Sequence, residues 1–402
     1  MTIKKIDILL FLIFGVIVSF GMILNSSFLA AFFVILTYVL ISLIVEKSSS
    51  VHMMFFVGFS TFIFLPTILN WYYLNTNTSL FFLSSIVAFL FLFLTKNTKV
   101  KEFHDYGNFI RIFYFISCSL VIFASILRLS SFVAATMAFL IILLSLSFKK
   151  NNIKNNIFYL IIFIITFFSY MLFSWEGFGR TVVFGWLLLA LLQFFYSINI
   201  NINKYLFALF PGVGATLLVN RDILNLKFTG IEEVLDDSAY SPYRLASTFI
   251  NSYQLQGMNI IGFFDQILYT FFIFIPRAIW PEKPYGFGFE YTVRHYTTAL
   301  IDAGHSIAAT LIGEHIYYLG YWGLITALII FSFIAWIINF FYKIKGLNGN
   351  GVLIFSASMM VLVWGGMTSF SSRIALPTII FLILYFCLRR FLFNKTRIKW
   401  GN

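Results

Sequence analysis

Residues able to move a proton gather in one polar stretch near the middle of this chain, between about residues 257 and 319. Glu314 lies in the sequence LIGEHIYYLGYWG, which is otherwise apolar and aromatic. A carboxylate in such surroundings is poised to act as a general base. His305, between Gly304 and Ser306, is a second candidate base. An ion pair with an arginine accounts for Glu314 equally well, so both roles stay open.

Arginine outnumbers lysine in the connections that are assigned below to the outer side of a membrane. A guanidinium is a rigid fork that binds phosphate oxygens in pairs, whereas an ammonium supplies only a point charge. We therefore predict an anionic, phosphate-bearing ligand on that side. Pairing with the acids of the same loops is the alternative. The outer basic residues are Arg128, Arg180, Arg221, Arg244, Arg277, Arg294 and Arg373, with Lys227 and Lys283.

Three of these arginines stand out by their positions. Arg277 follows Pro276 at the end of a long apolar run, and an ionisable group near membrane depth is a functional candidate. Arg180 and Arg373 lie in short loops directly beside apolar runs, away from the acids. All three are predicted to point toward one anion site.

Several common chemistries lack the residues they need. The outer connections carry no DxD motif, and the chain shows no HExxH, GxSxG or Walker sequence. Cys118 and Cys387 each lie alone in an apolar run. We therefore expect neither a metal site nor a cofactor. Charged residues are also scarce in the middle of the apolar runs, which disfavours an ion-coupled transporter.

The elements that must position these residues are membrane helices. Hydrophobic residues make up 60% of the 402-residue chain and charged residues only 10%, against about 25% in soluble domains. We predict one all-α, polytopic membrane domain over residues 1–402 with about twelve helices, the first retained rather than cleaved. The expected spans are 6–24, 27–45, 51–70, 79–95, 110–127, 131–148, 157–174, 181–198, 204–220, 319–342, 350–369 and 374–393.

Charge sets the predicted orientation. Most of the 27 lysines and arginines fall at one set of span ends, which the positive-inside rule assigns to the cytoplasm. This placement explains the net charge of +12 without nucleic acid. A large outer loop then covers about residues 220–319. Its apolar segment 258–280 is predicted to be re-entrant or interfacial, because a crossing would put the basic C-terminal tail outside. Helices are expected near 257–269 and 306–318.

A series of motifs in this loop resembles the O-antigen polymerase (Wzy-type) family of bacterial inner membranes. The order is Arg-x-x-Trp-Pro-x-Lys-Pro, Gly-x-Ser, Gly-Glu and Gly-x-x-Gly, at residues 277–284, 304–306, 313–314 and 320–323. The motifs cover about a quarter of the chain, and the remainder of the resemblance is one of architecture.

The resemblance implies a glycosyltransferase C-like fold and a metal-independent, inverting glycosyltransferase. Such an enzyme polymerises undecaprenyl-diphosphate-linked oligosaccharide repeat units, its donor and acceptor, on the periplasmic side of the inner membrane in lipopolysaccharide biosynthesis. A chain-length regulator protein would be a partner, with membrane lipid around the helices. Glu314 or His305 would be the base. The substrate-binding residues would be Arg277, Arg180, Arg373, Arg294, Lys283, Trp280 and Tyr285.

Two other functions fit parts of the same pattern. An O-antigen ligase, which moves the finished polymer onto lipid A core, would share the topology, the arginines and the carrier. A lipid-linked oligosaccharide flippase belongs to a different class and would need charge in a central lumen rather than in an outer loop.

Overall fold

A computed structural model of the protein describes most of the predicted helical segments. The described residues are 5–24, 28–45, 49–74, 78–95, 108–128, parts of 136–149, 151–174, 180–198, 241–256, 258–273, 275, 277–295, 307–343 and 352–371. Throughout these ranges the regular structure is helical and no strand occurs.

The helices follow the apolar runs in chain order. They are α1 (Lys5–Ile23), α2 (Phe28–Ile44), α3 (Ser50–Phe59), η1 (Ser60–Phe64), α4 (Leu65–Leu74), α5 (Ser79–Leu94), α6 (Asn108–Ile126), α8 (Ile153–Phe173), α9 (Arg180–Ser197), α12 (Ser241–Gln256), α13 (Ile260–Phe271), α14 (Phe287–His295), α16 (Leu311–Leu319), η3 (Gly320–Trp322), α17 (Gly323–Lys343) and α18 (Val352–Phe370).

Within the described residues, three helical stretches are long and apolar enough to cross a membrane: Val51–Trp71, Ile153–Phe173 and Leu311–Phe340. Shorter apolar helices lie at most of the other predicted spans. The spans predicted at 204–220 and 374–393 lie outside the described residues, and 131–148 is described only in part. The total number of spans and their orientation stay predictions.

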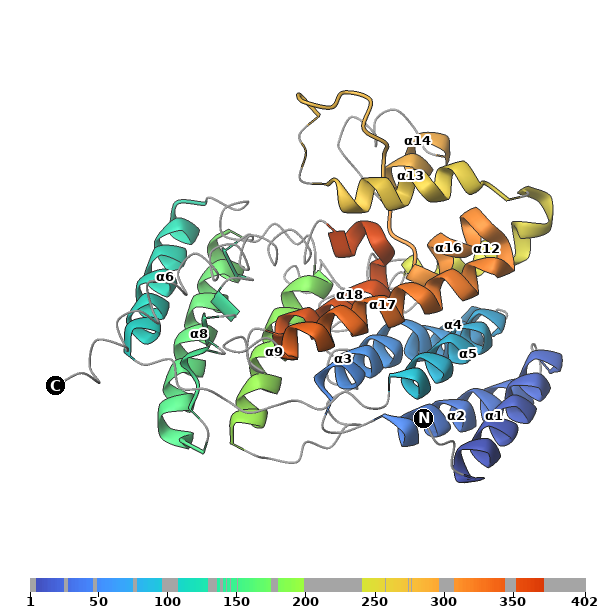
Figure 1. The fold of residues 1–402 in the computed structure, drawn as a ribbon, viewed down its shortest axis with the longest axis horizontal. Coiled ribbons are helices and arrows are strands. Elements are labelled where there is room, and N and C mark those ends of the chain that lie inside the picture. The colour runs from blue at the N-terminus through green and yellow to red at the C-terminus, as the bar shows by residue number, and fades with distance from the viewer. Residues whose placement is uncertain are drawn as a thin grey trace.

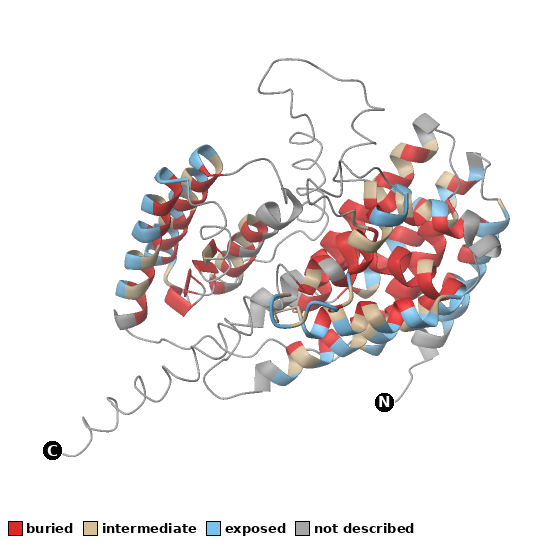
Figure 2. Cartoon of the chain, turned by 90° about the horizontal axis from the view of Figure 1, so that it is seen from above, coloured by how far each residue is buried: buried red, intermediate tan, exposed pale blue. Residues whose placement is uncertain are grey.

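The continuous helix formed by α3, η1 and α4 lies at the centre of the larger group of helices (Figure 1). Most of its residues are buried, and Figure 2 shows that buried residues fill the interior of the larger group of helices, with exposed ones on its outer faces. Gly58 lets α3 approach α18, because a Cβ there would lie 2.9 Å from the Cα of Met360. Small residues allow such close crossings between membrane helices. α18 also packs against α9, which connects this group to α8 and α6.

Polar side chains tie the central helix to its neighbours. At the single π-helical turn η1, the hydroxyl groups of Tyr38 and Ser60 are 3.0 Å apart. About two turns later, the Thr67 hydroxyl donates to Tyr243 of α12 over 2.7 Å. α12 is therefore anchored to the core even though it follows the long connection after α9.

Helix α13 has an inverted distribution of side chains. It buries the polar residues Gln266 and Thr270 on the side that packs against α16 and α18. Its opposite side is apolar and open, with Ile261 77% and Phe264 59% exposed. At 12 residues it is about 18 Å long, shorter than the hydrocarbon core of a bilayer. Segment 258–280 therefore does not form one continuous span, and the open face of α13 suits contact with lipid.

The remainder of the predicted outer loop is more helical than expected. The helices predicted near 257–269 and 306–318 are confirmed as α13 and α16, whereas α12 and α14 were not predicted. The predicted boundary at residue 319, between the helix near 306–318 and the span 319–342, falls at the break between α16 and α17, where Gly320 has φ +59°. α16 begins at Leu311, after Thr310 accepts a hydrogen bond from the N–H of Gly313, and continues through η3 into α17. Glu314 thus lies on a helix that leads into a long apolar stretch.

Spin labels test the position of α13. Cys118 and Cys387 are first replaced by alanine, and a cysteine that carries the spin label is placed at position 264. In nanodiscs, dissolved oxygen should relax the label at Phe264 strongly, and a water-soluble nickel complex should relax it weakly. A label at the exposed Glu282 should show the reverse. Equal exposure of both labels to nickel would show that this face of α13 does not contact lipid.

Candidate functional site

The carboxyl group of Glu314 is enclosed completely by neighbouring helices. Its side chain is 0% exposed. It lies in the first turn of α16, where Gly313 packs directly against Ala246 of α12. A buried carboxyl group is costly unless hydrogen bonds replace those to water. The groups that supply these bonds come from α13 and α18.

Helix α18 is broken where it passes Glu314. Gly365 and Gly366 leave the helical region, with φ −128° and ψ 15° at the first and φ +64° and ψ −159° at the second. Beyond the break, the N–H of Met367 donates to Glu314 Oε2 over 2.8 Å. A Cβ at Gly366 would overlap the Glu314 carboxyl group. The break and the carboxylate therefore fit each other, and only glycine suits position 366.

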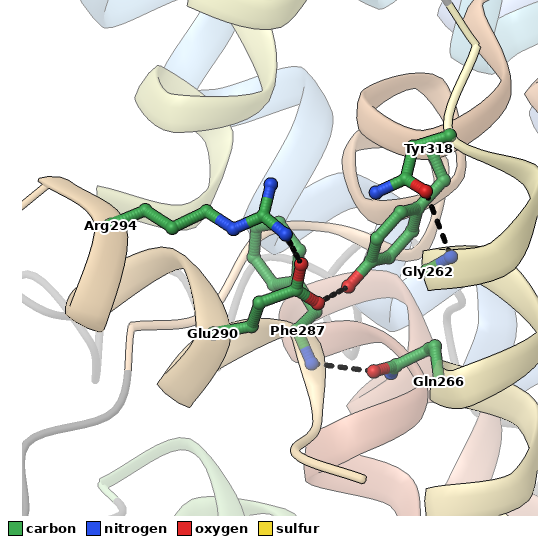
Figure 3. A network of polar contacts seen from close by, with 7 residues as sticks. Gly262, Gln266, Phe287, Glu290, Arg294 and Tyr318 are labelled. Atoms are coloured by element: carbon green, nitrogen blue, oxygen red, sulfur yellow. Dashed lines mark hydrogen bonds and ion pairs between the residues drawn. The ribbon is translucent and has the colours of Figure 1, made fainter.

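Gln266 of α13 is the second hydrogen-bond donor to Glu314. Its side chain is 1% exposed, and its Nε2 lies 3.4 Å from Glu314 Oε2. Its Oε1 accepts the backbone N–H of Phe287, the first residue of α14, as Figure 3 shows. One amide thus joins the start of α14 to the carboxyl group.

A second set of bonds holds α14 over α16 (Figure 3). The Tyr318 hydroxyl donates to Glu290 Oε2 over 2.7 Å. The other oxygen of Glu290 pairs with Arg294 Nη2, also at 2.7 Å, and the Arg294 side chain is 53% exposed. The predicted anion ligand Arg294 is therefore open to solvent, and it lies on α14, whose first residue is bonded to Gln266, the residue that donates to the buried Glu314.

Aromatic rings surround this network. Tyr291 contacts Tyr317 at 5.6 Å and the His295 ring at 4.3 Å between centroids. Phe249 of α12 also packs against this cluster, with 5.1 Å between its ring centroid and that of Tyr317. Tyr291 and Tyr317 are partly exposed and His295 is exposed. They form an aromatic surface beside Arg294.

Arg277 and Lys283 bind the backbone of their own loop. Arg277 Nη1 donates to the carbonyls of Pro281 and Lys283, at 3.3 and 2.6 Å, and Nη2 donates to that of Pro284 at 3.1 Å. Lys283 is buried, and its Nζ donates to the carbonyls of Ile273 and Ile275, at 2.9 and 3.0 Å. Burial lowers the pKa of Lys283, and the nearby Arg277 charge lowers it further. Both residues hold the segment between α13 and α14 in shape.

The two predicted aromatic ligands also lie on this segment. Trp280 meets Phe272 edge to face at 6.1 Å. The central carbon of the Arg277 guanidinium lies over the Tyr285 ring, 3.8 Å from the ring centroid. The Tyr285 ring also stacks on that of Phe289, with 4.5 Å between centroids. Cation–π contacts of this kind stabilise a loop as well as a ligand site.

Three predicted site residues cannot be placed by their side chains. His305 and Arg373 lie outside the described residues. α9 begins at Arg180, whose side chain is likewise outside the described part. The structure thus places Glu314 on α16 and Arg294 on α14, two helices joined by separate sets of hydrogen bonds, and groups Arg277, Lys283, Trp280 and Tyr285 in the loop.

The histidine next to Glu314 has a packing role. His315 is 1% exposed, its Nδ1 lies 2.7 Å from the Thr326 hydroxyl of α17, and its ring meets Phe263 edge to face. Where the chain is described, no three His, Cys, Asp or Glu side chains are close enough together to hold a metal ion.

Gln266 and Gly366 were not singled out from the sequence. A glutamine within an apolar segment and the pair Gly365-Gly366 within an apolar run are the signals that could have identified them, since both are costly in a membrane helix without a partner.

Comparison of the chain with protein-family models, with curated proteins and with solved structures gave no match. Function is therefore inferred from the residues and their geometry.

Replacing Gly366 with alanine should destabilise the protein by about 1–3 kcal/mol or more, because φ +64° with ψ −159° is a glycine-only conformation and the new Cβ would overlap Glu314. Gly15→Ala is the matched control, since a Cβ at Gly15 meets nothing within 4 Å. Thermal unfolding in detergent measures both. Equal melting temperatures for the two variants would contradict the described break.

Proposed function

We propose that this protein is an O-antigen polymerase of the Wzy type. It would transfer the growing glycan from one undecaprenyl diphosphate carrier to the non-reducing end of a new lipid-linked repeat unit. One observation carries the proposal: a half-exposed guanidinium on α14 and a buried carboxylate on α16 belong to helices that two sets of hydrogen bonds hold together, in an apolar, helical chain. The motif order described above supplies the reaction type.

The arginine serves the leaving group. In the transfer, the bond between the donor sugar C1 and the diphosphate oxygen breaks, and a bond from the acceptor oxygen to C1 forms with inversion. The diphosphate leaves with added negative charge, which a fixed guanidinium stabilises. Of the predicted arginine ligands whose side chains are described, Arg294 is the exposed one and Arg277 is partly buried. Arg277 uses three of its five N–H donors on backbone carbonyls. By the resemblance, Arg180 and Arg373 would complete the diphosphate site.

The carboxylate serves the acceptor. The attacking hydroxyl loses its proton to a general base, for which Glu314 and His305 are the candidates. Glu314 is closed to solvent by α13, α14 and α18. For Glu314 to act, the acceptor hydroxyl must enter between these helices, so the α14 contacts would open when substrate binds.

The aromatic surface beside Arg294 suits the sugars. The faces of Tyr291 and Tyr317 are apolar, and such rings stack on the C–H faces of pyranose rings. With the site on the outer side, the proposal places the chain in the inner membrane with about twelve spans. The donor and acceptor then meet in the periplasm beside lipid and a chain-length regulator.

Purified protein in nanodiscs tests the proposal directly. Lipid-linked repeat units isolated from a strain lacking the protein should be extended to a ladder of products without added metal. A deletion strain should carry lipid A core with a single repeat unit. Undecorated core would indicate a ligase instead, and absence of extension together with movement of repeat units across a sealed vesicle would indicate a flippase.

Arg294→Ala should slow extension by at least about tenfold, because removing a donor to a developing charge costs a few kcal/mol. Arg294→Lys should recover only a small part, since lysine lacks the paired donors. Lys154→Ala, at an exposed position on α8, controls for loss of positive charge. An Arg294→Ala protein with the wild-type rate would remove Arg294 from the diphosphate site.

A further inference from the structure

Gln266 lies where α13, α14 and α16 meet, and its side chain makes polar contacts with both α14 and α16. Its carbonyl accepts the N–H of Phe287 at the start of α14, and its amide nitrogen faces Glu314 Oε2 on α16. Glu314 Oε2 in turn accepts the N–H of Met367 on α18. Gln266 itself belongs to α13 and is 1% exposed.

The chemistry of these partners determines which way the amide lies. Phe287 presents an N–H, which only an acceptor can meet, so the glutamine oxygen must point to α14. The amide NH2 must then point to Glu314, where a carboxylate can only accept. No other uncharged side chain of this length offers an acceptor at one corner and a donor at the other.

We propose that Gln266 is a positioning residue that fixes the orientation and the negative charge of Glu314 and couples both to the placement of α14. Donation from the amide stabilises the charged carboxylate. Displacement of α14, which carries Arg294, withdraws the N–H that holds the amide in this orientation. The coupling gives Glu314 a link to the exposed arginine and rests on the proposed function only for its catalytic consequence.

Tyrosine is the commonest of the other ionisable groups on the helices around Glu314. α16 itself carries His315, Tyr317 and Tyr318, and α18 carries none within its described length. Those on the other helices that pack here, apart from Tyr342 and Lys343 at the far end of α17, are Tyr243, Arg244 and Tyr253 on α12, Asp265 and Tyr269 on α13, Glu290, Tyr291, Arg294 and His295 on α14, and Tyr321 on η3.

Two isosteric exchanges test this pairing. Gln266→Glu keeps the acceptor for Phe287 but places a second carboxyl group against Glu314, so the pair must bind a proton. The double exchange Gln266→Glu with Glu314→Gln restores every hydrogen bond. The amide introduced on α16 donates to the carboxylate introduced on α13, and its oxygen accepts the N–H of Met367. Gln266→Leu removes both bonds without adding charge.

Thermal unfolding from pH 5 to pH 8 distinguishes the variants. The folded Gln266→Glu protein holds a proton that the unfolded chain releases at about pH 4.3, so its melting temperature relative to wild type should fall as the pH rises. The double exchange should recover stability and lose this trend, and Gln266→Leu, which removes a donor from the Glu314 carboxylate, should show the same trend more weakly. A pH-independent defect in Gln266→Glu, or no recovery in the double exchange, would overturn the pairing.

Infrared spectroscopy detects the shared proton directly in the folded protein. Gln266→Glu should retain a protonated carboxyl band at pH 7 that is absent from the double exchange. Chain extension then separates the pairing from the function. The stable double exchange, with no carboxylate at position 314, should extend glycan at least about 100-fold more slowly. A wild-type rate in that protein would leave the pairing intact and refute the role of Glu314.

Discussion

The hydrogen bond from the Met367 N–H to the Glu314 carboxyl group is the contact on which the packing of α13, α14, α16 and α18 depends. A break in a buried helix leaves backbone groups without their usual partners, and a buried carboxylate needs donors in place of water. Here the N–H that the break in α18 leaves without a helical partner donates to the carboxylate, and the carboxylate gains a donor in place of water. Removing either partner leaves a buried polar group unsatisfied, which costs more than the bond itself contributes.

The basic residues near this contact fall into two groups, those that bind backbone carbonyls and one that is exposed. Arg277 and Lys283 are directed to backbone carbonyls and shape the segment between α13 and α14. Arg294 instead pairs with Glu290 and remains half exposed. A loop held by its own cations can present a rigid surface near lipid, where water competes weakly for the carbonyls. This segment leads into α14, whose first residue is bonded to Gln266, and Gln266 donates to Glu314.

The sequence predicted the helical class and most apolar segments, because a run of apolar residues in lipid has few alternatives to a helix. It also marked Glu314, since a lone carboxylate in LIGEHIYYLGYWG is conspicuous. The polar contacts of Arg277 were not predictable, because backbone carbonyls are offered by every residue and only the fold selects Pro281, Lys283 and Pro284. The short helices α12 and α14 were missed because their apolar residues are few and they are stabilised by packing against α16 and by Gln266.

The proposed function joins these features in one site: Arg294 for a diphosphate, aromatic rings for sugars, and Glu314 for the acceptor hydroxyl. A structure determined in a nanodisc with a short-chain polyprenyl diphosphate bound is the most direct measurement. We expect phosphate oxygens within hydrogen-bonding distance of the Arg294 guanidinium, beside Tyr291 and Tyr317, with the bond from Met367 to Glu314 retained. A diphosphate bound near Lys149 and Lys154, on the side predicted to be cytoplasmic, would contradict the account.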